Sequence, residues 1–389
     1  MHKTYFMLTN PFVIAGKIPD EYFCDRVEET DQLINYLTNH NNVVLTSPRR
    51  MGKSGLILHC FDRKEIRENF KTLYIDIYQT TSLKEFVLLF GRAVFDNLVP
   101  KSLSRVKLFM QILKSLKGKF SVDPITGLPS FNILLGDILY PDITLQEIFT
   151  YIEKYEKRCI IAFDEFQQIT KYPEKNIEAL LRTHISQGTN ANYIFAGSER
   201  HMITEMFFAY NRPFYNSTTP MTLEAIPKDI YCRFASRQFQ LYEKELSNEA
   251  IEKIYDHFEG ITFYLQRILN QAFADCRLKE RCDYDFLKKT IKKILEANSS
   301  IYRELLSMVG EQQKELLLAI ADSGKITGIT SSKFIKQYNL KSASSVQAAS
   351  KQLLEKDFIT KMEKTYTLSD KFMALWIRQT YGPGNDILL

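Results

Sequence analysis

The run Ser47-Pro48-Arg49-Arg50-Met51-Gly52-Lys53-Ser54 decides how the rest of the chain is interpreted. The apolar segment Val43-Val44-Leu45 precedes it and predicts a buried strand, whereas the residues from Gly55 onward predict a helix. A strand, a loop ending in Gly-Lys-Ser and a helix together form the context that a phosphate-binding P-loop requires. Ser47 stands where the usual spacing has its first glycine, so an ordinary basic strand-to-helix loop is the alternative interpretation.

The residue types of this loop suit ATP bound with Mg²⁺. Main-chain N–H groups of such a loop, together with those of the helix N-terminus, form a concave anion site. Gly52 leaves the backbone free to close on the phosphates because it has no Cβ. Lys53 is expected to reach the β- and γ-phosphates, and the Ser54 hydroxyl to ligate Mg²⁺. The predicted nucleotide-binding residues of the loop are Ser47, Pro48, Arg49, Arg50, Met51, Gly52, Lys53, Ser54 and Gly55.

A second signal lies in the segment 158–165, an almost continuous apolar run that ends in Asp164 and Glu165. This pattern is typical of a central parallel strand that is buried on both faces and carries carboxylates at its C-terminal edge. Two acids after a strand are usually a solvated turn. Downstream of a P-loop, however, they predict that Asp164 holds the water shell of Mg²⁺ and that Glu165 orients the attacking water as the catalytic base.

Composition limits the class of protein. The chain has 389 residues, enough for two or three domains, and its 45% hydrophobic content with 27 Phe and 21 Tyr excludes a disordered protein. The net charge of +5 permits nucleic-acid binding without indicating it. The 6 cysteines show no zinc spacing, no apolar run is long enough to span a membrane, and no signal-peptide core is evident. We therefore expect a reduced, cytoplasmic protein.

Two aromatic residues and an arginine upstream of the P-loop are further candidates. In P-loop ATPases this segment often folds back over the adenine base. Phe12 or Phe23 would then supply a ring face, and Arg26 a charge near the phosphates. The alternative is that the aromatic residues only attach the N-terminal arm to the core.

The strand predicted over 193–198 ends in Ser198. In a sheet of this class the strand beside the P-loop strand presents one polar residue to the γ-phosphate, so Ser198 is the predicted sensor, with Glu199 and Arg200 as its neighbours. Arg212 follows the next short helix, where ring-forming ATPases often carry an arginine finger for the neighbouring subunit. A salt-bridged loop arginine is an equally good interpretation of Arg212.

The sequence predicts an α/β P-loop domain over residues 1–229, with a hairpin inserted at about 118–134. Amphipathic helices without strand runs then predict a helical lid over 230–304. Three helices followed by two short strands predict a winged helix-turn-helix over 305–389. Its third helix exposes Gln347 and Lys351, which suit a DNA groove or phosphate, but it carries no arginine. An internal regulator packed on the lid remains the other interpretation.

Taken together, the P-loop, Phe163-Asp164-Glu165, Ala196-Gly197-Ser198 and the helix start at Ser342 resemble the archaeal-type ATPase family. This family is also abundant in Bacteroidetes and lies in the signal-transduction branch of AAA+-like proteins. The resemblance covers nearly the whole chain. Ser47 departs from it, as does Thr262, which stands where a Gly-x-Pro motif after Gly260 would have proline. The resemblance implies ATP binding and slow hydrolysis.

The leading hypothesis is therefore an Mg²⁺-dependent ATPase that self-associates, with double-stranded DNA as a second partner of the winged helix. A nucleotide-locked switch or scaffold that barely turns over, with the winged helix as a protein-interaction module, is the alternative from another class. An ATP-controlled DNA-binding protein is the third hypothesis.

Overall fold

The computed structural model describes residues 10–99, 103–116, 121–122, 129–130 and 133–382. These residues separate into two compact units. Residues 15–226 form the first unit, the α/β unit. Residues 227–382 form the second, helical unit together with residues 10–14, although the latter precede the P-loop in sequence. The three-domain division of the sequence analysis remains a prediction.

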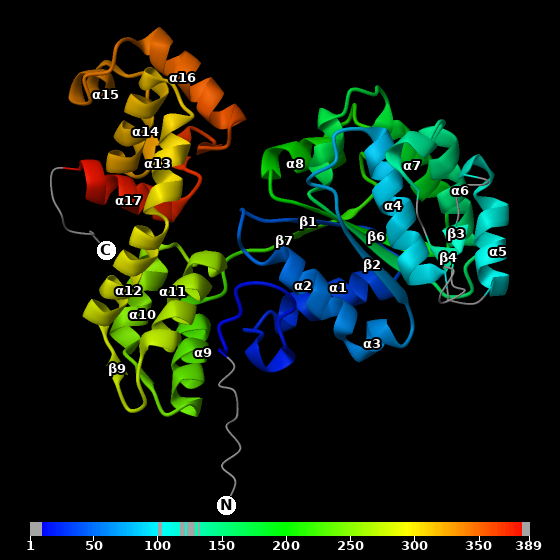
Figure 1. Ribbon diagram of the computed structural model, residues 1–389, viewed down its shortest axis with the longest axis horizontal. Helices are drawn as coiled ribbons and strands as arrows, with labels where there is room; N and C mark the ends of the chain where they lie inside the picture. The colour runs from blue at the N-terminus through cyan, green and yellow to red at the C-terminus, as the bar shows by residue number, and fades with distance from the viewer. Residues whose placement is uncertain (1–9, 100–102, 117–120, 123–128, 131–132, 383–389) are drawn as a thin grey trace, which may run out of the picture. The chain divides into compact units, whose positions relative to one another are not determined.

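A parallel sheet lies at the centre of the α/β unit (Figure 1). Its five strands run in the order β2-β5-β6-β1-β7, and the register of every neighbouring pair is parallel. The strands are β1 (Val43–Thr46), β2 (Lys71–Asp76), β5 (Cys159–Asp164), β6 (Ala191–Gly197) and β7 (Thr219–Thr222). Because β6 lies between β1 and β5, the carboxyl ends of the three strands predicted to carry the site meet at one edge. This confirms the predicted P-loop NTPase architecture.

Helices cover both faces of this sheet and bury its apolar side chains in two separate clusters (Figure 1). The first face packs against α1 (Val27–Thr38), α2 (Lys53–Asp62) and α3 (Lys64–Arg67). The opposite face packs against α4 (Leu83–Leu98), α5 (Leu103–Ile112), α6 (Pro141–Glu153), α7 (Ile177–Gln187) and α8 (Arg200–Phe208). Coverage of both faces explains why β5 is apolar from Cys159 to Phe163 and why every residue from Cys159 to Asp164 is buried.

The segment 83–116 follows β2 and is helical in three pieces. The segment forms α4, α5 and a 3₁₀ turn at Lys114–Leu116, and α4 ends at Leu98, shortly before Pro100 in the sequence. The predicted hairpin is represented by β3 (Ser121–Val122) and β4 (Pro129–Ser130), which pair antiparallel. Its turn, residues 123–128, lies outside the described residues.

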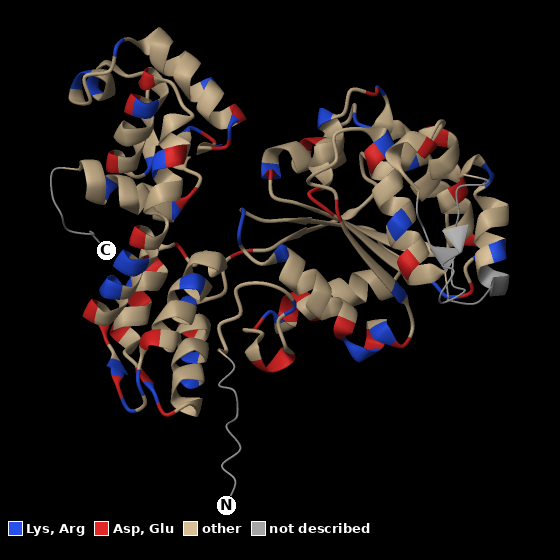
Figure 2. Cartoon of the chain, viewed as in Figure 1, with Lys and Arg blue, Asp and Glu red and all other residues tan. Residues whose placement is uncertain are grey.

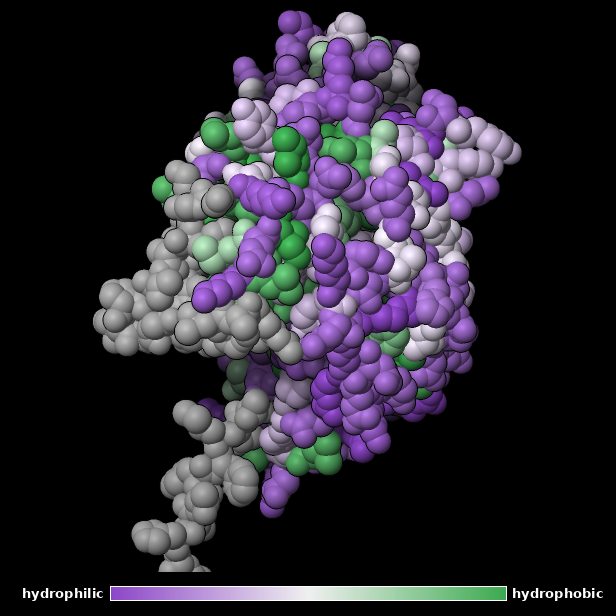
Figure 3. Space-filling model, turned by 90° about the vertical axis from the view of Figure 1, so that its right-hand side faces the viewer, coloured by the Kyte–Doolittle hydropathy of each residue, from purple (hydrophilic) through white to green (hydrophobic). Residues whose placement is uncertain are grey.

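Apolar side chains reach the surface beside this insertion. Figure 3 shows apolar groups between polar ones on the side of the molecule that carries α5 and α6. Leu134 and Leu139 are each more than two-thirds exposed, at 72% and 71%. Smaller exposed fractions belong to Leu108, Leu135, Tyr140 and Ile143. Nothing in the described residues shows what covers these side chains.

The helical unit begins with α9 (Lys228–Leu241), α10 (Asn248–His257), α11 (Thr262–Asp275), α12 (Tyr284–Ala297) and α13 (Ser299–Ser307). Two short strands, β8 (Glu245–Leu246) and β9 (Arg281–Cys282), pair between these helices. Phe12 lies fully buried here, with its ring centroid 5.6 Å from that of Phe239 and 6.0 Å from that of Phe273. Phe12 thus attaches the N-terminal arm to the core of the helical unit. This agrees with the alternative interpretation of Phe12, in which the ring only anchors the arm.

This anchor predicts a stability effect. Replacing Phe12 with alanine removes a fully buried ring, and large-to-small substitutions of this kind cost about 3 kcal/mol or more. The urea-unfolding transition of the helical unit should therefore move to lower denaturant. Phe263→Ala on α11 is the matched control, because that ring is 39% exposed. Equal destabilisation by the two substitutions would contradict a buried role for Phe12.

The C-terminal part forms the predicted winged helix-turn-helix. Its helices are α14 (Glu311–Ser323), α15 (Ser332–Gln337) and α16 (Ala343–Glu355), followed by β11 (Ile359–Met362), β12 (Thr365–Leu368) and α17 (Lys371–Tyr381). A short strand that the sequence analysis did not identify, β10 (Ile326–Thr327), adds a third strand to the wing by pairing with β12. Ser342 caps α16 by accepting a hydrogen bond from the Ser345 N–H, which explains why the helix begins there.

Two chain-wide features concern cysteines and membranes. All six cysteines are buried, and none of them forms a disulfide. Within the residues that the structure covers, no helix is both long and apolar enough to cross a bilayer.

Candidate nucleotide site

The P-loop leaves β1 and enters α2 through a tight backbone turn. Ser47 is completely buried at the end of β1, and its hydroxyl donates to the Pro48 carbonyl at 2.8 Å. Gly52, directly before α2, has a φ of 92°, a conformation that a side chain strains. Arg50 also has a positive φ, of 69°. This connection begins with a small residue, Ser47, which fits the buried end of β1. It ends with Gly52, which adopts the positive φ that the turn into α2 requires.

Lys53 is the first residue of α2 and only 6% exposed. Burial lowers the pKa of its ammonium group, and the neighbouring Glu165 and Asp164 carboxylates oppose part of that decrease. A buried amine among carboxylates, at the amino end of a helix, is well suited to bind an anion that brings several negative charges.

Ser54 and Asp164, the two predicted metal ligands, lie together. The Ser54 hydroxyl donates to Asp164 Oδ2 at 2.6 Å, although 110 residues separate them in sequence. The Tyr74 hydroxyl on β2 donates to the same carboxylate oxygen, and the Glu165 N–H donates to Oδ1 at 3.0 Å. Burial and the negative charge of Asp164 raise the pKa of Tyr74, which keeps the phenol protonated as a donor.

This pair of oxygens fits Mg²⁺ bound with a nucleotide. In the part of the chain that the structure describes, no three Asp, Glu, His or Cys side chains gather into a metal cage. Mg²⁺ at phosphate sites characteristically uses one or two protein oxygens and completes its shell with phosphate and water. Ser54 Oγ and Asp164 Oδ2 supply that number.

Glu165 adopts a left-handed backbone, with a φ of 56°, directly after β5. One of its carboxylate oxygens, Oε2, accepts from the Ser198 hydroxyl at 2.7 Å and from Gln167 Nε2 at 2.5 Å. Arg49 of the P-loop reaches the Ser198 hydroxyl through Nε at 3.4 Å. The predicted base and the predicted sensor are therefore in direct contact, and an arginine of the P-loop extends that connection.

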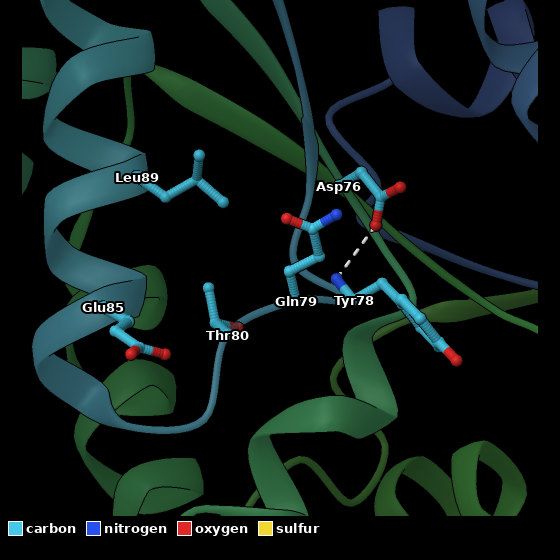
Figure 4. Close-up of a pocket in the computed structure, with 6 residues that line it drawn as sticks. All are labelled: Asp76, Tyr78, Gln79, Thr80, Glu85 and Leu89. Atoms are coloured by element: carbon cyan, nitrogen blue, oxygen red, sulfur yellow. Dashed lines mark hydrogen bonds between the residues drawn. The ribbon is translucent and has the colours of Figure 1, made fainter.

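A pocket of about 430 Å³ opens beside the carboxyl end of β2 (Figure 4). Glu85 and Leu89 enter it from α4, and Asp76, Tyr78, Gln79 and Thr80 from the strand end and the loop after it. Asp76 pairs in register with Asp164. Burial raises the pKa of Asp76, the hydrogen bond from the Tyr78 N–H opposes that rise, and the charges of Asp164 and Glu165 add to it. No P-loop residue lines this pocket, so it is not the phosphate site.

Phe23 and Arg26 lie in the segment that precedes α1. The Phe23 ring stacks on His59 of α2, with ring centroids 3.8 Å apart, and would be 3.9 Å from a Cβ added at Gly55. Arg26 is 4% exposed and binds Glu29 at 2.6 Å, whereas its second terminal nitrogen, Nη2, is buried and has no hydrogen-bond partner among the described residues. The Phe23 side chain thus lies against the first turns of α2.

Arg212 follows α8 in the α/β unit. Its guanidinium binds Glu178 at the start of α7 and lies 3.6 Å from Glu205 on α8. The geometry is that of a salt-bridged loop arginine, the second interpretation of this residue. Its action on a neighbouring subunit remains a prediction.

Sequence reasoning missed three polar residues of the site: Tyr74, Asp76 and Gln167. Tyr74 and Asp76 alternate on β2 with the buried Leu73 and Ile75, so they form its polar face. This alternation could have identified both residues from the sequence. In a parallel sheet, the carboxyl end of β2 lies at the same edge as Asp164, the last residue of β5. Gln167 gave no comparable signal, since its contact depends on the turn after β5.

The fold and the site define a P-loop ATPase domain joined to a winged helix, and comparison with known families agrees. The family model for an ATPase domain predominantly from Archaea matches residues 23–268, and the chain belongs to this family. A second model, for a probable winged helix domain, matches residues 300–379. Among curated proteins, none matches the sequence significantly.

Solved structures share the fold at low identity. A Walker-type ATPase of Pyrococcus abyssi is 20% identical with a TM-score of 0.62, and the match covers 95% of this chain and 99% of that one. The Aeropyrum pernix ORC2 protein, in its ADPNP–ADP complexes, is 13% identical with a TM-score of 0.58, covering 95% and 96% of the two chains. At these identities the likeness concerns the fold alone.

Proposed function

We propose that the protein binds ATP with Mg²⁺ and hydrolyses it slowly. The observation that carries this proposal is the 2.6 Å contact between Ser54 Oγ and Asp164 Oδ2, beneath a buried Lys53 at the start of α2. Two metal-ligand types from separate elements meet at the amino end of a helix, where phosphates bind. Membership of the ATPase-domain family and the nucleotides named for the ORC2 structure support the same conclusion.

In this proposal each residue has a separate task. Lys53 and the loop amides hold the phosphates, while Ser54 and Asp164 hold Mg²⁺, which when bound neutralises phosphate charge. Glu165 orients the attacking water, and Ser198 reports the γ-phosphate. Phe23, which stacks on His59 of α2, supplies a ring face to the adenine base, and Arg26 supplies a charge near the phosphates. Release of phosphate from ATP by purified protein, with no release by Lys53→Ala, tests the activity.

The contacts of Glu165 favour the alternative of a nucleotide-locked switch. Ser198 and Gln167 both donate to Oε2 and occupy its two acceptor sites, so this oxygen must release one of them before it accepts from water. Such a cost slows turnover. Gel filtration of protein loaded with ATP distinguishes the two functions: intact ATP in the protein peak after hours indicates a switch, and ADP indicates an ATPase.

Double-stranded DNA is the proposed second partner. Gln347 and Lys351 are exposed on α16, and Lys361 and Lys364 are exposed on the wing. Acidic residues such as Glu355 and Glu363 accompany them, and Figure 2 shows both signs of charge in this part of the chain.

This mixed surface predicts weak, salt-dependent DNA binding. With two to four phosphate contacts, the logarithm of the DNA association constant falls by roughly 2–4 for each tenfold rise in salt concentration. The reason is that each contact releases condensed counterions from the DNA. Fluorescence anisotropy with a labelled duplex at several salt concentrations measures this slope. Lys351→Ala should reduce the slope by about 1, whereas Lys64→Ala on α3 should not. Absence of binding at low salt would contradict the proposal and favour a protein-interaction module.

A further inference from the structure

Tyr74 lies at the metal-site carboxylate although it belongs to neither the P-loop nor β5. Its hydroxyl donates to Asp164 Oδ2, the oxygen that also accepts from Ser54. The contact joins β2 to the end of β5, across 90 residues of sequence. Tyr74 therefore contacts the group that the proposed function assigns to Mg²⁺.

The register of the sheet explains how Tyr74 reaches this position. Tyr74 pairs with Ala162 of β5, and Asp164 lies two residues further along the same face of that strand. Ala162 is completely buried and small, so it leaves space for the phenol ring to extend toward Asp164. The ring packs against the apolar cluster beneath α2, which restricts its motion.

Three donors from different elements fix the Asp164 carboxylate. Ser54 on α2 and Tyr74 on β2 hold Oδ2, and the Glu165 main chain holds Oδ1. Asp76 lies directly opposite Asp164 in the register and carries charge of the same sign. Like charges on paired residues repel, so the phenol supplies an attraction at the place where the neighbouring strand otherwise repels the carboxylate.

We propose that Tyr74 is a positioning residue: it holds the Asp164 carboxylate in the orientation that receives Mg²⁺ with the nucleotide. This inference rests on the proposed function. Partners that orient a metal ligand through a hydrogen bond typically change metal affinity 10- to 100-fold when they are removed. Tyr74 acts through Asp164 and does not itself contact phosphate or metal.

The test uses Tyr74→Phe, which removes the hydroxyl and keeps the ring in its apolar contact. Mn²⁺, in place of Mg²⁺, is titrated into full-length protein with saturating ADPNP, and free Mn²⁺ is measured by electron paramagnetic resonance. We expect the variant to bind Mn²⁺ about 10-fold more weakly than the wild type. Half-saturation by Mg²⁺ in the ATPase assay should rise by a similar factor, with little change in rate at saturating Mg²⁺.

Tyr36→Phe is the matched control. Tyr36 on α1 packs against the same apolar cluster, and its hydroxyl accepts a hydrogen bond from Gln32 at 2.7 Å, away from Asp164. This variant should bind Mn²⁺ as the wild type does. Thermal unfolding of the three proteins shows whether a lower Mn²⁺ affinity results from a less stable fold. If Mn²⁺ affinity falls in proportion to the melting temperature in both variants, the positioning role is overturned.

The same Mn²⁺ titration distinguishes failure of the proposed function from failure of the positioning role. If the wild type takes up no Mn²⁺ with ADPNP, the proposed function is wrong and the role of Tyr74 falls with it. If the wild type binds Mn²⁺ and Tyr74→Phe binds it equally well, the site is correct and the positioning role is overturned.

Discussion

Lys53→Ala is expected to weaken ATP binding at least about 30-fold and to remove measurable hydrolysis. Lys53 is 6% exposed, and its ammonium group interacts with the Glu165 and Asp164 carboxylates, which hold it at the site. Truncating one partner of a buried charge contact typically costs about 2–5 kcal/mol, and 2 kcal/mol corresponds to about 30-fold in affinity. Isothermal titration calorimetry with Mg-ATP measures this loss.

Lys64→Ala provides the control for net charge. Lys64 begins α3 and is exposed, so its loss removes one positive charge without touching the loop. ATP affinity should then equal that of the wild type. If the two lysine variants bind ATP equally well, the P-loop does not hold the phosphates as proposed.

Glu165→Gln should separate binding from hydrolysis. We expect ATP affinity within about threefold of the wild type and a hydrolysis rate lower by about 10² or more, the contribution typical of a positioned general base. Glutamine has the shape of glutamate and can still accept a hydrogen bond from Ser198 or Gln167, so the fold should not change. Single-turnover release of labelled phosphate measures the rate.

Glu224→Gln is the matched control for this experiment. Glu224 follows β7, is exposed and pairs only loosely with Arg200, at 3.3 Å. Replacing the Glu224 carboxylate with an amide should leave the hydrolysis rate unchanged. Unaltered turnover in Glu165→Gln would remove Glu165 from the mechanism, whereas loss of ATP binding would show that it supports the pocket instead.

The sequence contained enough to predict the sheet and the winged helix. The apolar runs at Val43 and Cys159 have to be buried on both faces, and such strands occur in parallel sheets under helices. The start of α16 at Ser342 could be predicted equally well, because a local hydrogen bond of the capping residue determines it. These elements depend on residues close together in the chain.

What could not be predicted depends on residues that are distant in sequence. The donor set on Asp164 requires the register between β2 and β5, which places Tyr74 beside Ala162. The attachment of Phe12 to the helical unit requires contacts with residues more than 200 positions away. The alternation on β2 places Tyr74 on one face of that strand but does not give its register with β5, and no period in the sequence indicates the attachment of Phe12.

Calorimetry of the wild-type protein tests the central claim most directly. ATP is titrated into the full-length chain with excess Mg²⁺ and again with the metal removed by EDTA. Saturable binding that is markedly tighter with Mg²⁺ is the predicted result, because Ser54 and Asp164 contribute only through the metal. No heat in either titration, or equal affinity with and without Mg²⁺, would contradict a metal-assisted triphosphate site at Lys53.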